Sequence, residues 1–63
     1  MDFYEYEGRL IAVAEDGRGW ALSNEDWRWR ATSPDFAASM FARGNPLTEA
    51  EARRRFNFAQ LPA

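Results

Sequence analysis

The Asp16-Gly17 pair stands between two apolar segments and is the strongest local signal in this 63-residue chain. Glycine adopts a positive φ without a Cβ penalty, and an Asp-Gly pair favours a two-residue type I′ turn. The pair therefore predicts a β-hairpin, with Arg9–Ala14 as its first strand and Arg18–Ser23 as its return strand.

Two further segments alternate between apolar and polar residues, as half-buried strands do. The first is Phe3–Glu7, which ends at Gly8, a second position suited to a tight turn. The other is Trp27–Ala31, in which we expect both tryptophans to point inward and both arginines outward. The strands then form an antiparallel meander of three or four strands over residues 3–31.

The second half of the chain carries two helix-start signals. Ser33 is a good N-cap, and Pro34 suits the first helical position, so they predict a helix over 34–43. Gly44 suits a left-handed cap at the end of that helix. The expected buried stripe is Phe36, Ala37, Met40 and Phe41.

The second helix-start signal is the capping box formed by Thr48 and Glu51. It predicts a helix over 49–58, whose buried stripe would be Ala52, Phe56 and Ala59. Glu49 with Arg53 and Glu51 with Arg55 would form ion pairs between successive turns, in the favourable order.

These elements predict one small α+β domain over residues 1–63, in which the two short helices pack on one face of the sheet. We expect that covered face to carry Tyr4, Tyr6, Trp20, Leu22, Trp27 and Trp29. The other face would show Glu5, Glu7, Arg28 and Arg30 to water.

Composition argues against several classes of function. The chain has no cysteine and no histidine, so a disulfide framework and a cysteine/histidine zinc site are excluded. Its start is acidic, and its longest apolar run, residues 10–14, is too short for a signal peptide or a membrane span. We expect a cytoplasmic protein that has no membrane contact and needs no cofactor.

Catalysis has no evident machinery in this sequence. Its serines and threonines have no histidine, cysteine or lysine to activate them, and Ser33 and Thr48 already serve as helix caps. The close carboxylate pairs, Glu5 with Glu7 and Glu25 with Asp26, fall at expected exposed positions, where no burial would raise a pKa. We therefore expect a protein that is not an enzyme and holds no metal.

Nucleic-acid binding is one open alternative, because arginines beside aromatic residues can contact phosphates and stack on bases. Its candidate contacts are Arg28, Arg30, Arg53 and Arg54. The net charge of −2 and the fanning of successive arginines around a helix argue against it.

Protein binding is the function that the sequence favours. Ten aromatic residues exceed what so small a domain can hide, and Phe3 and Phe58 fall off the expected apolar faces. They either anchor a partner or fold back over the core. Residues 1–26 carry seven carboxylates against two arginines, which suggests a partner with a basic surface. The candidate partner-binding residues are Phe3, Glu5, Glu7, Glu25, Asp26 and Phe58.

In size, acidity and lack of catalytic groups, the chain resembles the small accessory proteins of phages and mobile elements. Such proteins act by occupying a surface of a host protein. The resemblance implies a regulatory or inhibitor-type module that binds its partner stoichiometrically. Pairing between copies of this chain, through sheet edges or the spare aromatic residues, is a further possibility.

Overall fold

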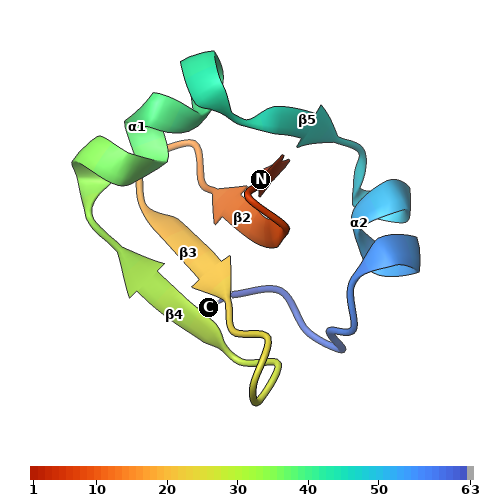
Figure 1. Cartoon of the computed structure of the whole chain (residues 1–63). Helices are drawn as coiled ribbons and strands as arrows, with labels where there is room; N and C mark the ends of the chain where they lie inside the picture. The colour runs from red at the N-terminus through yellow and green to blue at the C-terminus, as the bar shows by residue number, and fades with distance from the viewer. Residues whose placement is uncertain (63) are drawn as a thin grey trace.

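Five antiparallel strands form one sheet in the computed structural model, which describes residues 1–62 (Figure 1). The strand order is β4-β3-β2-β1-β5. The elements are β1 (Asp2–Tyr6), β2 (Arg9–Val13), β3 (Gly19–Leu22), β4 (Trp29–Thr32), α1 (Pro34–Arg43), β5 (Asn45–Leu47) and α2 (Glu49–Arg55). The predicted α+β class and the meander followed by helices are confirmed.

The fifth strand is an addition to the three or four that the sequence predicts. It lies between the two helices in the chain and pairs with β1, placing Leu47 opposite Phe3 and Asn45 opposite Glu5 (Figure 1). Pro46 occupies the middle of this edge strand, a place where a missing N–H is tolerated. The chain therefore leaves α1 and returns to the sheet before α2 begins.

The two helices pack on opposite faces of the sheet, not on one face as the sequence suggested. On one face, α1 contributes Ala37 and Met40 to a cluster with Tyr4, Ile11 and Val13. On the other face, Ala52 of α2 lies in a second cluster, whose buried strand residues are Phe3, Leu10, Ala12 and Leu22. Successive strand residues alternate between the two clusters. Both faces of the sheet are therefore covered, although the chain has only 63 residues.

The turns differ from one another in geometry. Glu7 and Gly8 both have positive φ, 51° and 79°, as a two-residue type I′ turn requires.

Gly17 has the predicted positive φ, 92°, but Asp16 does not, so the predicted type I′ turn there is wrong. Instead, Ala14 accepts a hydrogen bond from the Gly17 amide at 3.0 Å, and residues 15–17 form a three-residue loop.

Both predicted helix starts are confirmed. The Ser33 hydroxyl accepts a hydrogen bond from the Phe36 amide at 3.1 Å, and α1 spans Pro34–Arg43 as predicted. Thr48 and Glu51 form the complete capping box, with distances of 3.1 and 2.9 Å. The second helix ends at Arg55, three residues earlier than predicted.

Gly44 ends α1 for a reason other than the expected left-handed cap. Its backbone is extended, with φ −81° and ψ 154°. A Cβ at this position would lie 2.8 Å from the Cβ of Tyr4. Glycine therefore serves close packing between the helix end and β1, and not a positive φ.

Trp27 does not point inward from a strand. It lies in the loop before β4, has φ 58°, and is 43% exposed. Its amide donates to the Ser23 carbonyl at 2.9 Å, which closes this loop. The alternation from Trp27 to Arg30 is therefore a strand pattern only from Trp29 onward.

Candidate functional site

Phe41, on the last turns of α1, is the most exposed large apolar side chain among residues 1–62. Its side chain is 76% exposed, although the sequence predicts it in the buried stripe. A helix turns by about 100° per residue, which puts Phe36 and Phe41 at the two edges of that stripe and Ala37 and Met40 in its middle. Only the middle pair is buried. A helical-wheel count could therefore have identified Phe41 as a boundary residue.

The Phe41 ring has a fixed neighbour. It contacts Tyr4 of β1 edge-on, with ring centroids 6.2 Å apart. Tyr4 itself is buried beneath α1. This contact holds an exposed ring on a rigid helix and sheet, which lowers the entropy that the ring would lose on binding a partner.

A groove of about 500 Å³ lies beside Phe41, between α1 and the loop that joins β2 to β3. Its apolar lining consists of Val13, Ala14, Pro34, Ala38 and Phe41. We call this set, with the groove it encloses, the Phe41 groove. It is large enough to accept a bulky apolar side chain from outside.

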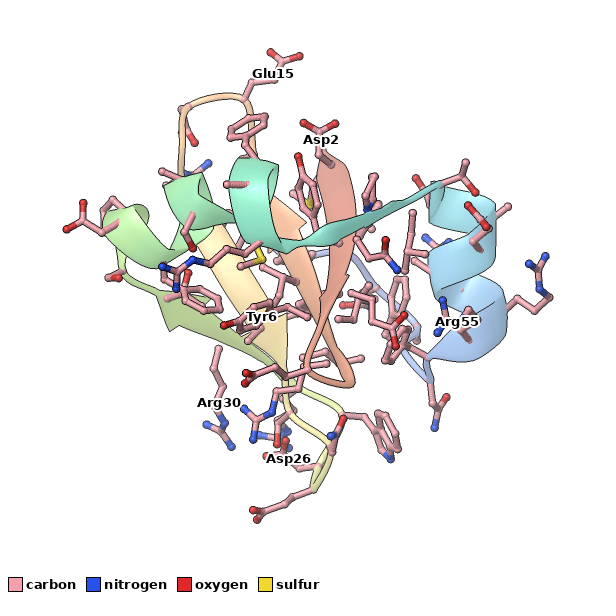
Figure 2. The ribbon with its side chains drawn as sticks, turned by 45° about the horizontal axis from the view of Figure 1, so that its top comes forward. Asp2, Tyr6, Glu15, Asp26, Arg30 and Arg55 are labelled. Carbon is pink, nitrogen blue, oxygen red and sulfur yellow. The ribbon has the colours of Figure 1, made fainter. Side chains whose placement is uncertain are left out.

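Carboxylates surround the Phe41 groove. They are Asp2, Glu15, Asp16 and Asp35. Figure 2 shows Asp2 and Glu15 at the same end of the molecule, the end away from Asp26 and Arg30. The rim is therefore acidic, with only one cationic side chain, Arg18, among the lining residues.

The positive charge of Arg18 is already paired within the fold. Its guanidinium lies 2.8 Å from the Asp16 carboxylate and 5.3 Å from the ring centroid of Trp20. The Arg18 backbone amide also donates to Asp16, and this hydrogen bond holds the pKa of the Asp16 carboxyl below its usual range. Asp16 is therefore ionised at neutral pH.

The predicted aromatic anchors are both directed into the molecule. Phe3 is only 3% exposed, so the hypothesis that it anchors a partner is wrong. Phe58 is half-buried, stacks on Phe3 at 6.3 Å, and meets Trp29 edge-on at 5.4 Å. The Arg53 guanidinium lies 5.0 Å from the Phe58 ring on another side. The positions of Phe3 and Phe58 match the alternative prediction, in which both rings fold back over the core.

The predicted acidic contacts come from three parts of the fold: β1, the β1–β2 turn and the β3–β4 loop. Glu5 faces α2 and accepts a hydrogen bond from Arg55 at 2.7 Å. Asp26 accepts one from Arg30 at 2.7 Å, in the loop before β4. Glu25 is exposed in that same loop, whereas Glu7 is exposed in the β1–β2 turn. The carboxylates around the Phe41 groove are a different group, and none of them was among the predicted partner contacts.

The arginines of the nucleic-acid alternative divide between two places. Arg28 lies directly before β4 and Arg30 lies on it, whereas Arg53 and Arg54 lie on α2. Arg30 pairs with Asp26, and Arg53 forms the predicted pair with Glu49 at 3.0 Å. The predicted Glu51–Arg55 pair is wrong, because Glu51 closes the capping box and Arg55 turns to Glu5. Half of the four candidate arginines are thus held in ion pairs within the fold.

Residues 1–62 contain neither a candidate metal site nor a membrane-spanning helix. No three acidic side chains there lie close enough together to hold a metal ion. Neither helix is long and apolar enough to cross a membrane.

Comparison with protein-family models, with curated proteins and with solved structures gives no match for this chain.

Proposed function

We propose that this protein is a non-enzymatic interaction module of the inhibitor type, which acts in the cytoplasm by binding another protein stoichiometrically through the Phe41 groove. The observation that carries the proposal is the 76% exposure of Phe41 on α1, where its ring contacts the buried Tyr4. Exposed aromatic side chains beside an apolar hollow are enriched at protein interfaces.

The chemistry of the groove selects its partner. An apolar lining favours a bulky apolar side chain, and the acidic rim favours lysine or arginine flanking that side chain. Burying one phenylalanine side chain stabilises a complex by about 1.5–3 kcal/mol. The rim carboxylates would mainly raise the association rate at low salt, because opposite potentials steer encounter.

The test begins with capture of the partner from a lysate of the source organism, followed by surface plasmon resonance on the purified pair. Phe41→Ala should speed dissociation by about tenfold or more, which corresponds to about 1.4 kcal/mol. Glu15→Gln with Asp35→Asn should instead slow association, by a factor that shrinks as salt rises.

Leu61→Ala is the matched control, because Leu61 is also an exposed apolar side chain, at 40%, and does not line the Phe41 groove. It should leave both rates unchanged. Binding that survives Phe41→Ala but is lost in Leu61→Ala would place the interface elsewhere. Binding lost only when Arg28 and Arg54 are both changed to Gln would favour an acidic partner or a nucleic acid instead.

A further inference from the structure

A second hollow, of about 460 Å³, lies along the other edge of α1. Ile11 and Ala21 line it from neighbouring strands, where they are directly paired. Tyr6 and Phe36 also line it, and their rings meet edge-on with centroids 5.8 Å apart. The hollow thus combines aliphatic and aromatic surface, and its volume falls in the range of small-molecule sites.

Two opposite charges stand at this hollow, on either side of Gly8. Glu7 and Arg9 both line it, and both are exposed. Neither side chain makes an ion pair or a hydrogen bond with any residue in 1–62, and they do not pair with each other. The type I′ turn holds both residues at one end of the hollow.

Two of the three hydroxyl groups that line the hollow, those of Thr32 and Ser33, are already engaged, and the third belongs to Tyr6. Ser33 accepts the hydrogen bond that caps α1, and the Thr32 hydroxyl donates to the Ser33 carbonyl at 3.3 Å. Glu7 and Arg9 are therefore the charged groups with capacity to bind a ligand in this hollow. A ligand that pairs with both must carry an anionic group and a cationic group together, as the carboxylate and ammonium groups of an amino acid do.

We propose that this hollow binds a small zwitterion with an apolar side chain, namely a free aromatic or aliphatic amino acid. Its carboxylate pairs with Arg9, its ammonium group pairs with Glu7, and its side chain lies against the partly exposed Ala21 and Phe36. A simple anion would meet the Glu7 carboxylate, and a simple cation would meet the Arg9 guanidinium, so each is disfavoured. The site goes beyond the proposed function, because it uses neither Phe41 nor the Phe41 groove.

Amide NMR spectra of the ¹⁵N-labelled protein test this proposal with three probes: L-phenylalanine, phenylacetate and phenethylamine. L-Phenylalanine should shift the signals of residues 6–11, 20–22 and 32–36 in a saturable manner. It should bind about tenfold more tightly than either singly charged probe. No saturable shift, or equal affinity for phenylacetate, would overturn the assignment of a zwitterion site.

Charge-neutralising variants separate the two contacts. Arg9→Gln and Glu7→Gln should each weaken L-phenylalanine binding by about tenfold, and Glu7→Gln should improve phenylacetate binding. Arg54→Gln, which removes an exposed arginine of α2 outside the hollow, is the control and should change nothing. Spectra of the free variants establish that each is folded. Equal responses in all three variants would contradict the proposed contacts.

Discussion

The Glu5 carboxylate accepts a hydrogen bond from the Arg55 guanidinium at 2.7 Å, which joins the first strand to the second helix across 50 positions of sequence. The two side chains are 24% and 43% exposed, so solvent screens this pair only in part. A double-mutant cycle with Glu5→Gln and Arg55→Gln should give a coupling energy of about 0.5–1 kcal/mol, reduced by salt. Urea unfolding measures it. A coupling energy of zero would mean that the pair adds nothing to stability.

Gly19 of β3 permits the close approach of α1. A Cβ on Gly19 would lie 2.6 Å from the Cβ of Ala37 and 2.8 Å from the Thr32 hydroxyl oxygen. Gly19→Ala should therefore destabilise the fold by about 1–3 kcal/mol, because the helix must move away from the sheet. In an Ala37→Gly background, Gly19→Ala should lower the free energy of unfolding by about 1 kcal/mol less than it does in the parent. Thermal or urea unfolding measures this difference. An equal loss of stability in both backgrounds would show that the Gly19–Ala37 contact does not set the distance between α1 and the sheet.

Glu51 should make stability depend on pH. Hydrogen bonding to Thr48, first through its backbone amide, lowers the pKa of the Glu51 carboxyl. A depressed folded-state pKa contributes stability that is present above the unfolded pKa, about 4.3. That contribution is lost as pH falls through the folded-state pKa. NMR titration should show this pKa rising only in part in Thr48→Ala, because the variant removes the Thr48 hydroxyl but keeps the backbone amide.

Glu51→Gln is the companion variant for that titration. Glutamine can still complete the capping box but does not ionise. The variant should therefore unfold with a weaker pH dependence than the parent in the acidic range below about pH 4.3. An unchanged pH dependence would assign the acid sensitivity to other carboxyls, among which Asp16 and Asp26 also have lowered pKa values.

Truncation should destabilise the fold much more at Phe58 than at Phe41. Phe58 is packed against the core with Trp29 and Phe3, so Phe58→Ala should destabilise the fold by about 2–3 kcal/mol. Phe41 makes one edge-on contact and is mostly exposed, so Phe41→Ala should cost less than about 1 kcal/mol. Urea unfolding compares the two. A larger cost at Phe41 than at Phe58 would reverse their assigned roles.

Local signals in the sequence were sufficient for the helices. Ser33 with Pro34, and Thr48 with Glu51, act through hydrogen bonds and φ restrictions within four residues, so their effect does not depend on distant packing. Gly17 is a similar case, because a positive φ belongs to the residue itself. The exact turn type was not predictable, since it also depends on how β2 and β3 pair.

The side of the sheet that each helix covers could not be read from the strands. From Leu10 to Val13, β2 is apolar on both faces, so its pattern does not distinguish a strand covered once from a strand covered twice. The three-residue β5 was missed because Asn45-Pro46 indicates a break, and only its pairing with β1 makes it a strand. Both outcomes are set by contacts between distant segments.

The candidate site was the least predictable part. Its acidic rim combines Asp2, the 15–16 loop and Asp35, which are brought together only when α1 lies over the β2–β3 end of the sheet. The acidic first half of the chain did indicate an acidic surface. Which carboxylates remain on it depends on pairs such as Glu5 with Arg55, which join residues from the two ends of the chain.

Pro46 has a consequence for how copies of this protein can meet. The sheet has two outer strands, β5 and β4, and a proline in the middle of β5 cannot donate a hydrogen bond to an incoming strand. Trp29–Thr32 of β4 contains no proline. Backbone pairing between two molecules would therefore be favoured at β4 over β5, and a pair joined at β4 would leave only its two proline-containing β5 edges outermost. Such edges would offer a third molecule no backbone donor at their central residue.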